Sequence, residues 1–152
     1  MASTISAATM TVKIEESINL NGQAQGAITS LSVASVNEVY KRIVSLDATN
    51  STNLLAFGDV NGLGQFHDTD VRYIRVTNLD NTNYATLRVV GASSTDFSVR
   101  LDPGASWLAS VPSALGVDDF GDNAGVSLEK LTSIAGTSNT AAVDLEVFVA
   151  SA

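Results

Sequence analysis

The chain has 152 residues, a net charge of −8, a pI near 4.3 and no cysteine. This length suits one domain with a substantial core, and the lack of cysteine excludes disulfides and thiolate metal sites. Because acidic surfaces repel phosphates, we expect neither nucleic acid nor an anionic membrane as a direct partner.

Only 16% of the residues are charged, against about 25% in a typical globular domain. Ser, Thr, Asn and Gly must therefore cover much of the surface. Such a surface is easily desolvated and suits contact with other subunits, although an ordinary neutral surface has the same composition. No apolar run approaches the ~20 residues that cross a bilayer. Residues 1–10 also lack the basic and apolar regions of a signal peptide, so none is expected.

Apolar alternation along the chain predicts short β-strands. Residues 1–9 are small and polar and are interpreted as an N-terminal arm. Asn21-Gly22 indicates a tight turn between the first two strands. Strands are predicted over residues 9–20, 27–34, 37–46, 53–58, 71–77, 84–90, 96–101, 105–110 and 143–149, whereas residues 128–135 form a strand or a short helix. Polar, Gly-rich residues 58–70 and 111–127 are predicted to be long loops.

A short phrase occurs twice, as LDATN at residues 46–50 and as LDNTN at residues 79–83, and LDPG at residues 101–104 is a variant of it. Asp and Asn side chains hydrogen-bond nearby backbone and tolerate unusual dihedral angles. We therefore interpret these phrases as turns between strands, in an antiparallel domain built of hairpins.

The predicted fold is an all-β antiparallel sandwich, jelly-roll-like, with about nine or ten short strands. Leu87 and Val89, followed by Phe97, Val99 and Leu101, are expected on one face, as in a sheet with one solvated side. A single sandwich domain is predicted over residues 10–152, preceded by the arm at residues 1–9.

No catalytic motif is recognisable, and an enzyme is not expected. The sole histidine, His67, lies in a Gly-rich loop, and no Gly-x-Ser-x-Gly turn is present to support a triad. The glycines from Gly58 to Gly64 lack the Lys-Ser/Thr of a phosphate-binding loop. We therefore predict no catalytic residues and no cofactor.

Two acidic loops offer oxygen ligands of the kind that calcium prefers, but the terminal Glu of an EF-hand is missing. The simpler interpretation is that these residues cap turns and add solubility, so no metal ligand is predicted. The candidates are Asp59, Asn61, Asp68 and Asp70 in the first loop and Asp118, Asp119 and Asp122 in the second.

Exposed aromatic side chains could bind sugars, but at strand positions core or cross-strand packing is the more common role. The candidates are Tyr40, Tyr73, Tyr84 and Trp107. Four arginines in the central strands could form a basic docking stripe for an acidic neighbour, or could pair across strands with Asp80 or Asp96. They are Arg72, Arg75, Arg88 and Arg100.

Residues 70–90 (DVRYIRVTNLDNTNYATLRVV), continuing to FSVRLDPGAS at residues 97–106, resemble small virion proteins of tailed bacteriophages, particularly marine and cyanobacterial ones. In that family, IRVTNLD and LxPGxS mark consecutive strands of a β-sandwich. The resemblance covers about residues 54–110. It implies a structural role in the virion, as a capsid cement or decoration protein or as a tail component, and it brings no catalytic residues.

The resemblance and the low charge together predict a non-enzymatic protein located at the capsid surface. Its expected partners are the major capsid protein or other virion proteins, and it is expected to form a homo-oligomer on the symmetric lattice. The arm or the two long loops would reach neighbouring subunits. Two alternatives remain: a tail or fibre component, as a ring, adaptor or glycan-binding module, and a calcium-dependent adhesive β domain.

Overall fold

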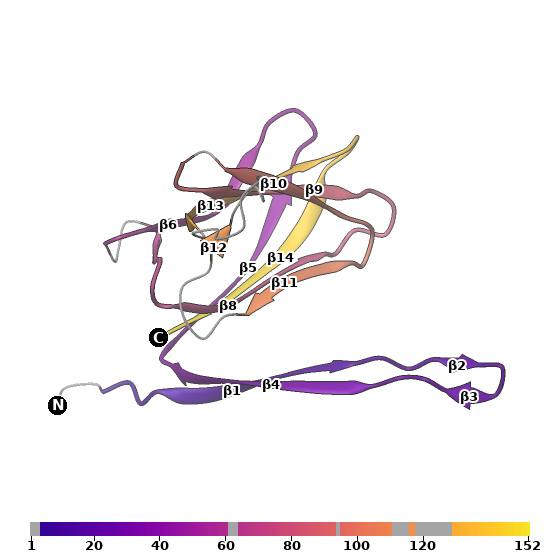
Figure 1. Ribbon diagram of the computed structural model, residues 1–152. Helices are drawn as coiled ribbons and strands as arrows, with labels where there is room; N and C mark the ends of the chain where they lie inside the picture. The colour runs from indigo at the N-terminus through magenta and orange to yellow at the C-terminus, as the bar shows by residue number, and fades with distance from the viewer. Residues whose placement is uncertain (1–3, 61–63, 94, 111–115, 118–128) are drawn as a thin grey trace, which may run out of the picture.

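A computed structural model describes residues 4–60, 64–93, 95–110, 116–117 and 129–152. Two stacked sheets form the body of the molecule (Figure 1). The sheet that we call the β14 sheet has the order β11 (Ser106–Ser110), β8 (Val71–Asn78), β14 (Val143–Ser151), β5 (Glu38–Leu46). The β9 sheet has the order β10 (Asp96–Leu101), β9 (Ala85–Gly91), β13 (Glu129–Ser138), β6 (Thr52–Gly58), β7 (Phe66–His67), and β12 (Gly116–Val117) also pairs with β13.

This arrangement confirms the all-β antiparallel sandwich. Residues 129–138 form a strand, which decides between the strand and the helix predicted near there. The parallel pairing of β6 with β7 is an exception to the antiparallel pattern, and it places a short strand inside the loop predicted at residues 58–70. Most of the loop predicted at residues 111–127 lies outside the described residues. The jelly-roll order remains a prediction.

The core lies between the two sheets and consists largely of aliphatic side chains. On β14, Val143, Leu145, Val147 and Val149 are buried at every second position, as the alternation predicted. They pack with aliphatic residues of the β9 sheet such as Leu87, Val89 and Ile134. On β10, Phe97 and Val99 pair with Val89 and Leu87 on the predicted face, but Phe97 is exposed because β10 is the edge strand.

The repeated phrases do not form hairpins within one sheet, and that part of the prediction was wrong. Residues 46–50 connect β5 to β6, residues 79–83 connect β8 to β9, and residues 101–104 lead from β10 to β11. Each connection leaves one sheet and enters the other. The phrases specify the turn itself, but the turn does not decide whether the next strand pairs with the last one or crosses the sandwich.

The first two turns share one hydrogen-bonding solution. In each, the Asp Oδ1 accepts hydrogen bonds from the backbone N–H groups two and three residues later, at 2.7 and 2.6 Å. These bonds, that from Asn50 foremost, lower the pKa of Asp47, and the bond from Asn83 is the largest cause of the lowered pKa of Asp80. Both carboxylates therefore remain ionised and hold the turns closed at neutral pH.

Asn78 joins two of these corners from inside the protein. Its side chain is fully buried, and its Nδ2 donates to the carbonyl oxygens of Asn83 at 2.9 Å and Leu101 at 3.0 Å. Its Oδ1 accepts from the N–H of Asp80 at 2.9 Å. One amide thereby satisfies backbone groups of both the β8–β9 turn and the end of β10, although Leu101 is 23 residues from Asn78 in the sequence.

The N-terminal quarter of the chain lies outside the two sheets. Strands β1 (Ala8–Glu15) and β4 (Ile28–Val36) form a separate two-stranded sheet, with β2 (Asn19–Leu20) and β3 (Gln23–Ala24) paired toward its tip. Figure 1 shows this pair running beneath the sandwich and extending well past it. The projecting part is therefore longer than the predicted arm at residues 1–9, since the sandwich itself begins with β5.

Candidate assembly surface

The projecting segment, which we call the ribbon (residues 8–36), is one long hairpin. Its paired residues keep a constant register from Met10 opposite Val33 to Leu20 opposite Gln23. Equal numbers of residues separate the two paired stretches on both sides, so the register is unbroken. The tip is Asn21-Gly22, with φ of 52° and 79°. Both positive values are those of the two-residue turn that matches strand twist, which confirms the predicted turn.

A bulge fixes the base of the ribbon to the sandwich. The register shifts between Ala8 and Met10, and Ser35 on the opposite strand takes a φ of 60°. The extra residue resets the alternation, so that Val33 and Val36 are both buried although they are three residues apart. They pack on the outer face of the β14 sheet, in a cluster with Tyr73, Ala150 and Phe148 that Met10 and Val12 complete.

Beyond this base, the same face of the ribbon carries exposed aliphatic side chains. With an unbroken register, alternation places Ile14, Ile18 and Leu20 on the face of Met10 and Val12. Leu31 joins them from the opposite strand, because it pairs with Val12. We call these four the distal stripe; their exposed fractions run from 42% to 55%.

The opposite face of the ribbon is mostly polar. It carries Thr11, Lys13 and Glu15, which pair with Ser32, Ser30 and Ile28. The ribbon is thus amphipathic, with one face suited to water and one suited to a partner. An isolated two-stranded hairpin is at best marginally stable in water, and no third strand supports the distal part among the described residues. The distal stripe therefore has the chemistry of an interface.

The sequence already showed the alternation that builds this face. The strand predicted over residues 9–20 rests on the alternation of Met10, Val12 and Ile14, then of Ile18 and Leu20. Alternation cannot show whether a second sheet covers the apolar side, and the domain predicted over residues 10–152 therefore includes the ribbon in the sandwich. A detectable signal was the combination of Asn21-Gly22 with unusually long flanking strands, which predicts a long hairpin.

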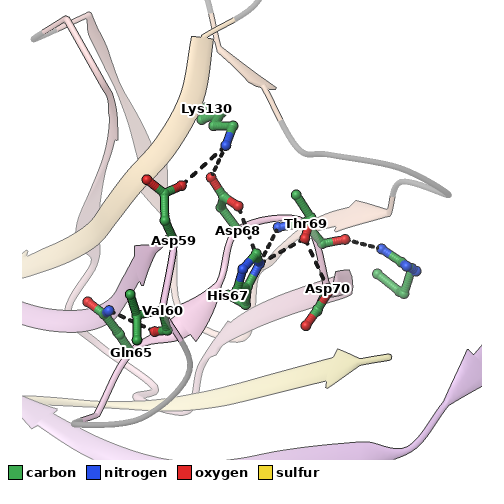
Figure 2. A network of polar contacts seen from close by, with 9 residues as sticks. Asp59, Val60, Gln65, His67, Asp68, Thr69, Asp70 and Lys130 are labelled. Carbon is green, nitrogen blue, oxygen red and sulfur yellow. Dashed lines mark hydrogen bonds and ion pairs between the residues drawn. The ribbon is translucent and has the colours of Figure 1, made fainter.

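A separate polar cluster lies beside β7 and is drawn in Figure 2. The side chain of Asp68 is only 6% exposed, and its Oδ2 lies 2.7 Å from Nζ of Lys130. Nζ also lies 3.3 Å from Oδ1 of Asp59. The hydrogen bond from Lys130 is the main cause of the lowered pKa of Asp68, and the Asp68 carboxylate correspondingly raises the pKa of Lys130.

This cluster contains two of the candidate calcium ligands, Asp59 and Asp68. Asp59 and Asp68 lie close together, as a calcium site in this loop would require, but the ammonium of Lys130 lies between their carboxylates. Asp70 Oδ1 accepts a hydrogen bond from Thr69 at 3.2 Å instead. In the described part of the chain, no three acidic or histidine side chains are grouped to hold a metal ion. Asn61 and the second candidate loop, with Asp118, Asp119 and Asp122, lie outside the described residues.

Lys130 offers a direct test of this interpretation. We expect Lys130→Met to lower the free energy of unfolding, because it leaves the buried carboxylate of Asp68 without its cation. Calcium should leave the melting temperature of the wild type unchanged, since the Lys130 ammonium already occupies the position between the two carboxylates. Lys13→Met, on the polar face of the ribbon, is the matched control. A melting temperature that rises with calcium and falls with chelator would contradict this assignment.

His67 lies in a cavity of about 680 Å³ between β5, β6 and β7, which Tyr40 and Arg42 also line. Its Nδ1 lies 2.8 Å from Oγ1 of Thr69 and 3.5 Å from Oδ1 of Asp68. The histidine is therefore engaged within its own loop, as Figure 2 shows. His67 thus belongs to the short strand β7 inside the predicted loop, and its Nδ1 contacts its own sequence neighbours.

The four arginines do not form one stripe, because Arg72 and Arg75 belong to the β14 sheet and Arg88 and Arg100 to the β9 sheet. Local acceptors hold them instead. Arg88 pairs with Asp96 at 2.5 Å, as predicted. The other contacts are Arg75 with Glu146 at 2.5 Å, Arg100 with Asp102 at 2.7 Å, and Arg72 with the carbonyl of Thr69 at 2.5 Å.

The aromatic candidates likewise serve packing. Tyr73 is buried edge-on to Phe148, and Trp107 packs against the main core. Tyr40 contacts Phe66 at 5.6 Å between ring centroids. The ring of Tyr84 lies 3.9 Å from the guanidinium carbon of Arg100. Three of the rings thus belong to strands β5, β8 and β11 of the β14 sheet and Tyr84 lies in the turn before β9, each in a packing contact of its own.

No protein-family model matches the chain, and no curated protein or solved structure shows significant similarity to it. Within the described residues, no helix has the length and apolar character to span a membrane.

Proposed function

We propose that this protein is a non-enzymatic structural component of a bacteriophage virion, acting as a capsid cement or decoration protein. The observation that carries the assembly part of this proposal is the uncovered distal stripe on the projecting ribbon. The resemblance of residues 54–110 to phage virion proteins supports the part of the proposal that places the protein in a virion. A cement protein binds neighbouring subunits, and a rigidly anchored ribbon can extend across the boundary between them.

The apolar area of the distal stripe would supply free energy of binding when a partner covers it. Burying a large aliphatic side chain contributes about 1.5–3 kcal/mol relative to leaving it exposed. The distal stripe offers four such side chains on one face, and several copies on a symmetric lattice would engage together. A partner that covers the stripe would also supply the support that a two-stranded hairpin lacks. The polar cluster at Asp68 and the paired arginines offer no comparable uncovered surface.

The ribbon can be shortened without disturbing its base. Val12 and Leu31 are cross-strand partners, as are Leu20 and Gln23 at the natural tip. Replacing residues 13–30 by Asn-Gly would therefore close the hairpin directly at the Val12–Leu31 pair, and Val12 is the last residue that contacts the base cluster. The shortened variant keeps Val33 and Val36 against the sandwich, so we expect the sandwich to fold normally.

The test uses particles of the phage whose genome encodes the chain. Mass spectrometry of purified virions should detect the protein at a stoichiometric level. In cosedimentation, the full chain should bind capsids, and the shortened variant should bind at least tenfold less. Absence of the protein from virions would overturn the proposed function. Equal binding of the two variants would remove the ribbon from it.

A further inference from the structure

We propose that the ribbon of one copy docks on the outer face of β5 in a second copy, with Glu16 against Lys41. This inference rests on the proposed function, because it names the partner that the distal stripe contacts. It is argued from a match between two exposed surfaces of the same chain. Both surfaces show one strand pattern, in which two aliphatic side chains flank a charge.

The first surface is the middle of the ribbon. Ile14, Glu16 and Ile18 occupy alternate positions, and the unbroken register places them on the apolar face. Their neighbours across the hairpin, at residues 25, 27 and 29, are Gln, Ala and Thr. The surface therefore has two aliphatic side chains that flank one acidic side chain, among uncharged neighbours, and this acid needs a basic partner if the face is buried.

The second surface is the outer face of β5. Even-numbered β5 residues such as Tyr40, Val44 and Leu46 pack toward the main core. Alternation therefore turns Val39, Lys41 and Ile43 outward. Val39 and Ile43 are 57% and 58% exposed, which is more than any residue of the distal stripe. β5 is also the terminal strand of its sheet among the described residues.

The two patterns are complementary in both spacing and charge. Each places aliphatic groups two residues to either side of a charge, along strands with the same rise per residue. Lys41 already lies 2.9 Å from Glu146, which in turn contacts Arg75. The side chain of Lys41 is 59% exposed, so its ammonium can reach a second carboxylate. Glu16 would add to a charge cluster that already carries two cations and one anion.

Geometry assigns this contact to a second copy. The base of each ribbon is seated over Tyr73, Ala150 and Phe148, and from there the ribbon extends past its own sandwich (Figure 1). Its tip, with β2 and β3, therefore projects away from the molecule. The outer face of β5 belongs to the same β14 sheet as those seating residues, so the incoming ribbon would extend an existing layer. Such a head-to-tail contact closes into a ring or propagates as a filament.

Charge reversal tests this contact in the full-length protein. Light scattering with size exclusion should show the wild type as an oligomer with a mass several times 15.8 kDa. Glu16→Lys and Lys41→Glu should each reduce the mass to that of one chain, and the double variant should restore the oligomer. Glu15→Lys, with the same charge change on the opposite ribbon face, is the matched control and should remain oligomeric.

A monomeric wild type, or single reversals that leave the oligomer intact, would overturn the inference. Failure of the double variant to restore the mass would also overturn it. Because Lys41→Glu disturbs the contact with Glu146, its melting temperature is measured in parallel. Glu16→Lys lies on the exposed ribbon and tests the contact without that disturbance. Detection in virions is scored separately, so loss of this contact is distinguishable from loss of the virion role.

Discussion

Replacing Asn78 by Ala is expected to lower the free energy of unfolding by about 3–5 kcal/mol, a large share of the roughly 5–15 kcal/mol that stabilises a native domain. The substitution removes hydrogen bonds to the carbonyls of Asn83 and Leu101 and to the N–H of Asp80. These backbone groups belong to two corners that must pack together. Equilibrium unfolding in urea, followed by circular dichroism, gives the value.

Asn78→Asp should be more destabilising than Asn78→Ala at neutral pH. The two substitutions differ because a carboxylate would direct oxygens, in place of the Nδ2 hydrogens, at two carbonyl oxygens inside the protein. Asn81→Ala is the matched control, since Asn81 lies in the same turn and accepts only the exposed Thr82 hydroxyl. We expect it to change stability by less than about 0.5 kcal/mol. An Asn78→Ala variant as stable as this control would contradict the role assigned to the buried amide.

Gly26→Val is expected to abolish assembly while leaving the sandwich folded. A Cβ at Gly26 would lie 1.9 Å from the carbonyl oxygen of Glu16, which is backbone of the opposite strand and cannot move aside without separating the strands. The distal part of the ribbon would open, and the distal stripe would lose its common face. The sandwich core contains no residue of this segment, so its melting temperature should remain that of the wild type.

Two measurements check this prediction. Light scattering should show a single chain for Gly26→Val, and hydrogen exchange should show faster exchange of the amides around residues 16–27 than in the wild type. Ala24→Val, at another exposed position of the same strand, is the control and should leave the oligomer intact. An oligomeric Gly26→Val protein would mean that the distal ribbon does not carry the contact.

The behaviour of the ribbon shows where prediction from sequence stopped. Its strands, its tip at Asn21-Gly22 and the alternation of Ile14 with Ile18 follow from local preferences, and the structure confirms them. The sequence could not show that the aliphatic side chains on this face of the ribbon continue past the edge of the sandwich. Whether an apolar face is covered depends on residues distant in sequence, such as Tyr73 and Phe148, which cover only its base.

The polar cluster is a second example. The sequence brought Asp59 and Asp68 together as oxygen ligands in one loop, and the structure does place them side by side. It could not show that Lys130, 71 residues from Asp59, inserts its ammonium between them. A cluster of acids in a loop therefore predicts only a demand for positive charge. The tertiary structure decides whether that charge comes from the solvent or from the chain itself.

The sequence by itself determined the longer strands, the turn chemistry and the all-β class, because period-two alternation and Asp or Asn at turns act within a few residues. The sequence-local bonds of Asp47 and Asp80 are examples. Only the tertiary structure decided that these turns cross between sheets, that Asn78 joins two of them, and that the distal stripe is left without a cover. Those outcomes depend on which strands become neighbours, and sheet pairing is set by long-range packing that no local pattern encodes.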